Sequence, residues 1–441
     1  MTPSASAEPT ADTSALAQTR IGRYRWVIVA LLFFITTINY MDRQVIGVLK
    51  PELAKDLNWS EVDYGNIVTA FQLAYAAGYA GMGRLMDIIG VRWGLAIAAT
   101  IWSLAAAAHG LARSAFGFGV CRFALGIGEG GNFPAAIKTV ANWFPVKERS
   151  LATGIFNAGS NVGALITPIV VPLLTVAYGW PVAFYATGLV GLVWLVFWVV
   201  IYRRPEEHSR LSPEELAYIR SDPEIIPTEK TPWVTLFRYR GTWAFIVGTF
   251  LTSPVWWFYL FWVPDFLFRA HGLNLLTLGP PLVVIYLMTD VGSIGGGWLS
   301  TYLIDKGFGV LTARKIAFLI CALCVVPVCL APWLASLWLA TLIIGLAASA
   351  HQGFSANLYT IVSDTMPPDA ISSVVGIGGM AGSIGGMFVA QAAGWVLQTT
   401  GSYVPLFAWA SSMYLLATLL MHVILPRRRR DLIAAAHAPA Q

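Results

Sequence analysis

Gly83-Arg-Leu-Met-Asp-Ile-Ile-Gly-Val-Arg92 is a short polar segment between two long apolar runs, at about residues 64–85 and 93–112. Three of its ten residues carry a charge, in a chain where only 12% of all residues do. A run of about 20 apolar residues is long enough to cross a bilayer as a helix. The segment is therefore predicted to be a tight turn that joins two membrane-spanning helices on one side of the membrane.

Apolar runs of similar length recur along the whole chain, which is 57% hydrophobic. A soluble domain has about 25% charged residues, roughly twice the share seen here. We therefore predict an all-α membrane protein with twelve transmembrane helices. The predicted spans lie at about 26–49, 64–85, 93–112, 115–137, 150–176, 180–201, 243–268, 278–303, 313–333, 335–361, 372–398 and 403–425.

Basic residues are distributed unevenly over the loops between these spans. If the N-terminus is cytoplasmic, 22 of the 28 basic residues lie in segments on the cytoplasmic side and 4 lie outside. Cytoplasmic loops carry an excess of lysine and arginine, so this split predicts that both termini are cytoplasmic. The net charge of +5 follows from these loops and does not indicate a nucleic-acid partner.

The longest break between spans, at 202–242, divides the chain into two sets of six. Within it, Ser212 as N-cap, Pro213 at the first helical position and Glu215 as capping-box partner predict a short helix. The predicted domains are a cytoplasmic tail at 1–20, a six-helix bundle at 21–202, a cytoplasmic linker at 203–241, a second six-helix bundle at 242–426 and a tail at 427–441.

The two halves resemble each other in sequence. A shift of 222 positions places Gly154 on Gly376 and continues backwards to place Glu129 on His351. Parallel six-helix repeats predict two pseudo-symmetric bundles that rock about a site near the middle of the membrane. Glu129 and His351 are therefore predicted to face one site from opposite bundles, where His351 would bind a substrate hydroxyl or carboxylate, or relay a proton.

Charged residues are rare inside the predicted spans, and they include Asp42, Arg43, Arg122, Glu129 and Asp290. A charge in the hydrocarbon region is costly and usually marks a substrate or ion pathway. Arg122 and Glu129 are seven residues apart, so they share one helix face. These ions predict the transport of a charged solute with protons. The alternative is that they pair with one another and only hold helices together, and Asp290 in particular fits such a packing role.

The segment that begins at Gly83 resembles the G-x-L-x-D-x-x-G-x-R/K signature of the major facilitator superfamily. Several further motifs are similar to its anion:cation symporter branch, and some of them to hexuronate transporters. Together the similarity covers about residues 22–426. Arg122-x-x-x-Gly126 resembles the fourth-helix arginine motif of the superfamily as a whole. The motifs of the branch are Asn39-Tyr-Met-Asp-Arg43, Gly126-Ile-Gly-Glu129, Trp143-Phe-Pro-Val-Lys-Glu-Arg149, His351-Gln-Gly-Phe-Ser-Ala-Asn357 and Ser373-Val-Val-Gly-Ile-Gly-Gly-Met-Ala-Gly382.

The resemblance implies roles for particular residues. It implies Asp42 and Glu129, with Arg122 nearby, as proton-coupling sites. It implies that Arg43 meets the substrate carboxylate, or Glu129 when substrate is absent, and that Tyr75 contacts the sugar. It also implies a monomer without cofactors. The first motif would form a cytoplasmic gate, in which Gly90 allows the tight turn and Asp87 meets a basic group or helix N-terminus across the interface, together with Gly83 and Arg92.

A sugar acid also needs partners for its hydroxyl groups. Amide and tyrosine side chains suit polyols because they both donate and accept hydrogen bonds. Ser383 stands where some relatives have an asparagine, which favours a sugar acid other than galactonate. The candidates in the predicted spans are Asn157, Asn161, Tyr259, Gln352 and Asn357, with Trp256 and Trp257 as stacking residues of which at least one is expected to face lipid or the interface.

We therefore predict a proton-coupled importer of a hexuronate such as glucuronate or galacturonate. Its partners would be a small organic anion, protons and the lipid bilayer of the bacterial cytoplasmic membrane. The sequence contains no nucleophile–base set, metal-ligand cluster or phosphate-binding loop, which argues against an enzyme. The alternatives are transport of another organic anion (aldonate, aldarate or aromatic carboxylate) and uncoupled uniport or exchange.

Overall fold

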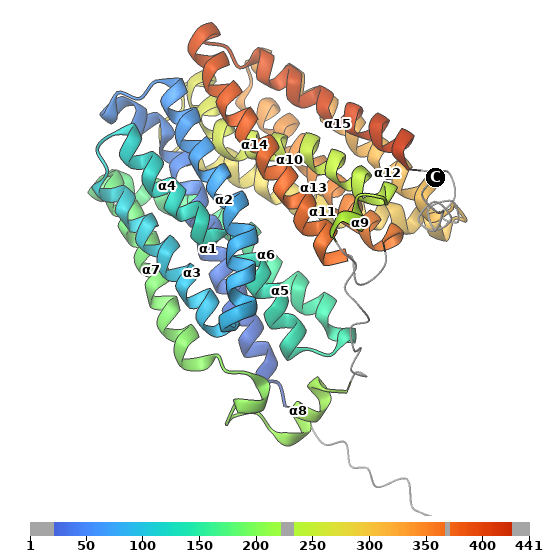
Figure 1. Cartoon of the computed structure of the whole chain (residues 1–441). Coiled ribbons are helices and arrows are strands. Elements are labelled where there is room, and N and C mark those ends of the chain that lie inside the picture. Colours follow the sequence, from blue (N-terminus) through green and yellow to red (C-terminus); the bar gives the residue numbers. More distant parts are fainter. Residues whose placement is uncertain (1–21, 222–232, 367–370, 426–441) are drawn as a thin grey trace, which may run out of the picture.

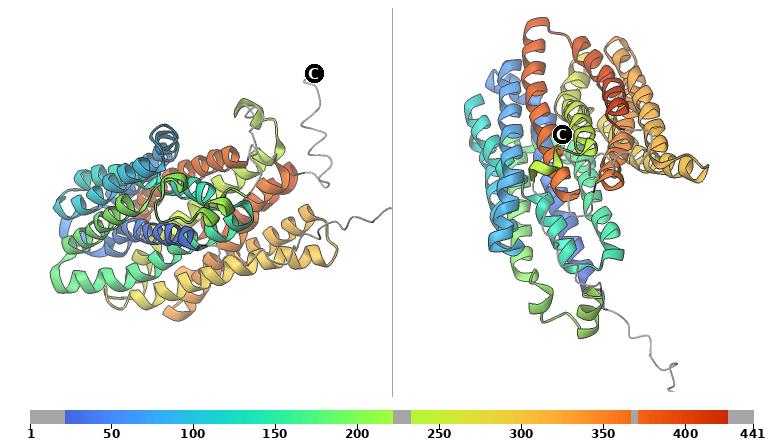
Figure 2. Two further views of the ribbon diagram at one scale, coloured as in Figure 1. Left: turned by 90° about the horizontal axis from the view of Figure 1, so that it is seen from below. Right: turned by 45° about the vertical axis from the view of Figure 1, so that its right-hand side comes forward.

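The computed structural model describes residues 22–221, 233–366 and 371–425. Within these ranges the secondary structure is helical, and the helices form two groups (Figure 1; Figure 2 shows the same division from two other directions). The N-terminal group contains α1 (Tyr24–Leu57), α2 (Glu61–Ile89), α3 (Val91–Ala108), α4 (Ala115–Glu129), α5 (Asn132–Trp143), α6 (Val146–Tyr178) and α7 (Trp180–Ile201). The C-terminal group contains α10 (Arg240–Ala270), α11 (Gly279–Asp305), α12 (Val310–Val325), α13 (Leu337–Thr365), α14 (Ile371–Thr400) and α15 (Val404–Ile424).

Ten helices in the described ranges are long and apolar enough to cross a membrane. The predicted span at 64–85 corresponds to α2, whose 29 residues include several charges near its ends. The predicted span at 115–137 is interrupted, because α4 ends at Glu129 and α5 begins at Asn132. Gly130 permits a close approach here, since an added Cβ would lie 2.6 Å from the backbone of Gly78 in α2. With these two, the twelve predicted spans are present in two bundles of six.

The linker contains the predicted short helix, α8 (Pro213–Ile219), and also α9 (Trp233–Leu236). Ser212 is the N-cap of α8, and the Ser212 hydroxyl accepts a hydrogen bond from the Glu215 backbone N–H at 3.2 Å. The predicted capping-box role of Glu215 is wrong. Its carboxylate instead accepts hydrogen bonds from the backbone N–H groups of Tyr24 and Arg25 at the start of α1, and from the Arg25 guanidinium. The linker helix therefore caps α1 and is fixed to the N-terminal bundle.

The two bundles touch through α2 and α14, α1 and α10, and α6 and α11. They approach closely at the end where α1 finishes and α2 begins, and they diverge toward α8 (Figure 1). Glycines make the close approach possible. An added Cβ on Gly65 would lie 2.8 Å from the carbonyl oxygen of Ala390 in α14, and one on Gly279 would lie 2.6 Å from that of Pro168 in α6.

Glycines nearer the other end of the same interface helices have no such neighbours. A Cβ added to Gly154 in α6, Gly295 in α11, or Gly376 and Gly379 in α14 would have no heavy atom within 4 Å. A Cβ on Gly83 in α2 would meet only Pro134 of its own bundle, at 3.8 Å. The bundle interface is therefore packed tightly at one end and loosely at the other.

Candidate functional site

Arg43 on α1 and Glu129 at the end of α4 form a buried ion pair. The Arg43 Nε donates to Glu129 Oε2 at 2.9 Å, and the second guanidinium nitrogen lies 2.8 Å from the same oxygen. The Arg43 and Glu129 side chains are 3% and 0% exposed. Arg43 also donates to Asn39 Oδ1 at 3.2 Å, one helical turn earlier on α1. The structure thus pairs Arg43 with Glu129, the partner that the family resemblance implies for Arg43 when substrate is absent.

Aromatic rings surround the Arg43 guanidinium. Its central carbon lies 4.7 Å from the ring centroids of Tyr40 and Tyr75, and 5.3 Å from that of Trp257. Such cation–π contacts stabilise a cation in a place where water is excluded. Trp257 belongs to α10, so the site around Arg43 includes side chains from both bundles.

Asp42 and Arg122 lie close to this ion pair in the chain but have few partners. Asp42 is 2% exposed, and neither of its carboxyl oxygens has a hydrogen-bond partner. Arg122 is 1% exposed and donates to the Arg43 backbone carbonyl at 3.2 Å, while its Nε and one terminal nitrogen have no partner. Arg122 therefore contacts the backbone of Arg43 and does not pair with a carboxylate.

His351 on α13 is the centre of a second polar group in the opposite bundle. Its Nδ1 lies 2.5 Å from the Tyr414 hydroxyl, and its ring stacks on Trp256 with centroids 5.0 Å apart. Both tryptophans contact candidate site residues, because Trp257 lies over Arg43 and Trp256 stacks on His351, and the expectation that one of them faces lipid or the interface stays a prediction. The two neighbouring indoles of α10 contact different helices, since Trp257 contacts Arg43 of α1 and Trp256 contacts His351 of α13.

The remaining candidates divide into those with protein partners and those without. The Tyr259 hydroxyl is buried without a hydrogen-bond partner, whereas the Ser383 hydroxyl donates to the Gly379 carbonyl at 3.0 Å. Gln352 is half-buried, and Asn157 is exposed on α6.

Two asparagines join helices to one another. The Asn161 amide donates to the Asp290 carboxylate and so connects α6 with α11 across the bundle interface. Asn357 donates to the carbonyls of Gly296 and Gly353 at 2.8 and 2.9 Å and accepts from Arg314. Both amide donors of Asn357 are thereby used within the C-terminal bundle, and we leave this residue out of the proposed site.

Comparisons with known proteins show the family of the chain. Residues 32–390 match the sequence profile of the Major Facilitator Superfamily. The chain belongs to the Major Facilitator Superfamily. It is 30% identical over 415 residues to the hexuronate transporter of Escherichia coli strain K12, which covers 93% of this chain and 96% of that one. It is 33% identical to the galacturonate transporter of Dickeya chrysanthemi over 311 residues, which covers 69% and 90%.

The fold also matches a solved transporter structure. This is a bacterial homolog of the human lysosomal transporter Spinster in an inward-facing and unoccupied conformation, with a TM-score of 0.67, 18% identity, and coverage of 94% of this chain and 97% of that one. The family match and the transporter relatives show that the protein is a multi-pass membrane transporter and not an enzyme.

The residues of the major facilitator signature lie where α2 turns into α3. Gly90 has a φ of 82°, a conformation that glycine adopts without strain. Arg92 donates to the Val199 carbonyl of α7 at 2.7 Å and thus binds within its own bundle. Gly83 faces α5 of the same bundle, and the side chain of Asp87 lies outside the described residues. The predicted gate contact from Asp87 to the other bundle stays a prediction.

Proposed function

We propose that the protein imports a hexuronate such as glucuronate or galacturonate together with protons. The buried Arg43–Glu129 pair of the N-terminal bundle, next to Trp257 of the other bundle, is the observation that carries this proposal. The names of the relatives support the substrate class, because they include hexuronate and galacturonate transporters. The proposed setting is the bacterial cytoplasmic membrane, with a monomeric chain and both termini inside.

Competition for one guanidinium explains why an anion would travel with a proton. The Arg43–Glu129 pair is neutral as a unit, and a sugar-acid carboxylate that binds Arg43 would displace Glu129 from the same guanidinium. Removing one partner from a buried ion pair is costly, so a substrate that takes Arg43 leaves the Glu129 carboxylate unstable as an anion. Protonation of Glu129 removes this unpaired charge. We therefore assign Glu129 as the group that couples proton uptake to substrate binding.

Asp42 is the second proposed proton carrier. A buried carboxylate without a hydrogen-bond donor is strongly disfavoured, and both Asp42 oxygens lack a partner in this conformation. We propose that Asp42 is protonated in the conformation described here and releases its proton when a water path opens to it. Arg122, which contacts the backbone beside Asp42, would favour the return of the charged form.

The rest of the site suits a polyhydroxylated ring. Tyr75 and Trp257 supply aromatic faces next to Arg43, and sugars stack their apolar faces on such rings. Polar groups from the C-terminal bundle would bind the hydroxyls. The main candidates are His351, whose ring stacks on Trp256 of α10, and Tyr259, a residue of α10 whose buried hydroxyl has no hydrogen-bond partner. Gln352 and Ser383 of the same bundle, and Asn157 and Asn161 of the N-terminal bundle, would complete the set as the bundles rock.

The conformation described here is proposed to be the inward-facing one. By the distribution of basic residues, the tightly packed end of the interface faces outside and the loosely packed end faces the cytoplasm. The similar solved structure is likewise described as inward-facing. Alternating access then requires the loose end to close and the tight end to open.

A panel of radiolabelled acids taken up by proteoliposomes tests the substrate class. Glucuronate and galacturonate are expected to be taken up and to compete with each other, whereas galactonate and galactarate are expected to compete about tenfold less well. The reason is that a site built to bind hydroxyls and one carboxylate loses hydrogen bonds to a differently shaped acid. Preferential uptake of an aldonate, an aldarate or an aromatic acid would replace the hexuronate by that class.

His351→Ala is expected to raise the KM for a hexuronate by about threefold to tenfold, because one hydrogen bond contributes about 0.5–1.5 kcal/mol. Tyr414→Phe removes the hydroxyl that orients the imidazole and is expected to raise KM in the same direction by less. The measurement is the concentration dependence of uptake. An unchanged KM and unchanged proton dependence in both variants would show that His351 has only a packing role.

A further inference from the structure

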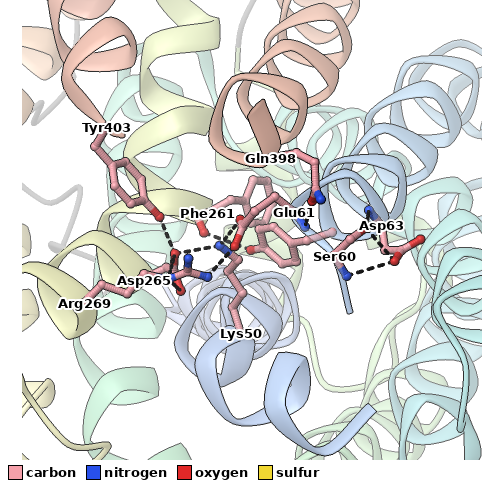
Figure 3. A network of polar contacts seen from close by, with 10 residues as sticks. Lys50, Ser60, Glu61, Asp63, Phe261, Asp265, Arg269, Gln398 and Tyr403 are labelled. Carbon is pink, nitrogen blue, oxygen red and sulfur yellow. Dashed lines mark hydrogen bonds and ion pairs between the residues drawn. The ribbon is translucent and has the colours of Figure 1, made fainter. Parts of the chain in front are cut away.

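Four charged side chains meet at the tightly packed end of the interface (Figure 3), where Lys50 follows Arg43 by seven residues on α1. Lys50 of α1 and Glu61 of α2 belong to the N-terminal bundle, and Asp265 and Arg269 of α10 belong to the C-terminal bundle. The side chains of Lys50 and Asp265 are 1% and 0% exposed, that of Glu61 is 14% exposed and that of Arg269 is 46% exposed. Three of the four charges are therefore largely shielded from water.

These residues form ion pairs both within and between the bundles. Between the bundles, Lys50 Nζ lies 2.6 Å from Asp265 Oδ2, and Arg269 pairs with Glu61. Within each bundle, Lys50 Nζ lies 2.7 Å from Glu61 Oε2, and Arg269 Nε lies 3.0 Å from Asp265 Oδ2. Each charge thus has one partner in its own bundle and one in the other, and the four charges sum to zero.

Neighbouring groups fix the cluster in place. The Tyr403 hydroxyl donates to Asp265, and the Lys50 ammonium lies 4.5 Å from the ring centroid of Trp262. Two neutral contacts also cross between the bundles here. Tyr64 donates to the Phe261 carbonyl at 2.9 Å, and the Glu61 backbone N–H donates to the Gln398 side chain at 3.1 Å.

The pairing pattern has a physical consequence for opening. A buried ion that loses its only partner is strongly destabilising, so an interface held by cross-bundle pairs alone would be hard to separate. Here separation leaves Lys50 paired with Glu61 and Arg269 paired with Asp265. The closed interface gains the cross-bundle pairs, and the open interface keeps one neutral pair on each side.

We propose that Lys50, Glu61, Asp265 and Arg269 are the latch of the outer gate. The gate closes through ion pairs between the bundles, and it opens without leaving any of the four charges unpaired. The proposal rests on the alternating-access function proposed above. Its test uses neither sugar acid nor protons, so a failure of the latch and a failure of the proposed substrate or coupling give different results.

The experiment exchanges charges within one bundle and then in both. Lys50→Glu with Glu61→Lys keeps an ion pair inside the N-terminal bundle but places like charges opposite each other across the interface. Adding Asp265→Arg with Arg269→Asp restores opposite charges across the interface. The reporter is Gln72→Cys, at a position that is fully buried in the contact between α2 and α14, in a chain whose Cys121, Cys321, Cys324 and Cys329 are replaced by serine.

The measurement is the rate at which an impermeant maleimide, added outside right-side-out vesicles, modifies Cys at position 72. The two-residue exchange in the N-terminal bundle (the half exchange) is expected to raise this rate at least tenfold. The four-residue exchange in both bundles (the full exchange) is expected to return the rate to within about threefold of the parent. Glu206→Gln, which neutralises one partner of an exposed pair with Arg220, is the control and should leave the rate unchanged. Equal rates in the parent and the half exchange, or equal rates in the half and full exchanges, would overturn the latch. Modification only from the cytoplasmic side would overturn its outer location.

Discussion

Replacing Arg43 with glutamine is expected to reduce hexuronate uptake at least about 100-fold. The guanidinium makes charge-assisted hydrogen bonds to Glu129, and in the proposed cycle it makes equivalent bonds to the substrate carboxylate. Hydrogen bonds to a charged group contribute about 1.5–3 kcal/mol, and each 1.4 kcal/mol corresponds to about a tenfold change in affinity. The initial uptake rate and the equilibrium binding of a labelled hexuronate measure the effect.

A double variant separates this binding role from a purely structural one. Arg43→Gln alone leaves Glu129 buried without its partner, which could impair folding by itself. Arg43→Gln with Glu129→Gln replaces the ion pair by two amides of similar size that can bond to each other. We expect the double variant to restore the amount of folded protein but not substrate binding. If transport also returned, the pair would be a structural contact and the site would have to lie elsewhere.

Gly154→Leu is expected to reduce transport by about tenfold to 100-fold while substrate binding from the cytoplasmic side persists. In the present conformation a side chain at Gly154 fits freely, because an added Cβ has no heavy atom within 4 Å. In α6 and α11, Pro168 lies against Gly279, and Asn161 lies against Asp290. The residue number falls along α6 as it rises along α11, so the two helices run antiparallel.

Continuing this register places Gly154 opposite the segment around Gly295, where an added Cβ also has no neighbour. Closure of the cytoplasmic end would bring the two together, and a leucine there would overpack the contact at a cost of about 1–3 kcal/mol. The substitution should therefore hold the protein in its inward-facing state.

Gly119→Leu is the matched control for this variant. Gly119 is also a helical glycine without a neighbour at its Cβ position, but it lies on α4 beside the exposed side chains of Phe116, Val120 and Phe123. Its substitution should leave transport unchanged. The readout is uptake together with counterflow exchange. Normal exchange in Gly154→Leu would show that the cytoplasmic end closes through some other contact.

The helices were largely predictable from the sequence because each apolar run had to bury or shield its backbone as a helix in the membrane. The short linker helix followed from local chemistry, since Ser212 and Pro213 act within one turn. The interruption at Gly130 and Gly131 was not predictable, because the close contact found there is with α2, a separate segment of the chain. Contacts between segments far apart in the sequence leave no local pattern.

The site was predictable in part for the same reason. A charge pair between α1 and α4 follows from the rarity of ions in the spans, and the structure brings Arg43 and Glu129 together. Asp265 lies in a predicted span but was missed, because its partner Lys50 sits at the end of a different span and looks like an ordinary loop charge. Asn357 resembled a hydroxyl ligand by type, yet its partners are carbonyls on α11 and α13.

Uptake of labelled glucuronate into proteoliposomes under an imposed inward proton gradient tests the central claim most directly. For the parent protein we expect accumulation above the external concentration, which disappears when the gradient is collapsed. For Glu129→Gln we expect gradient-driven accumulation to be lost while counterflow exchange survives, because the amide mimics the protonated, substrate-loaded form. Uptake of glucuronate that is indifferent to the gradient, or a Glu129→Gln variant that still accumulates substrate, would contradict the account.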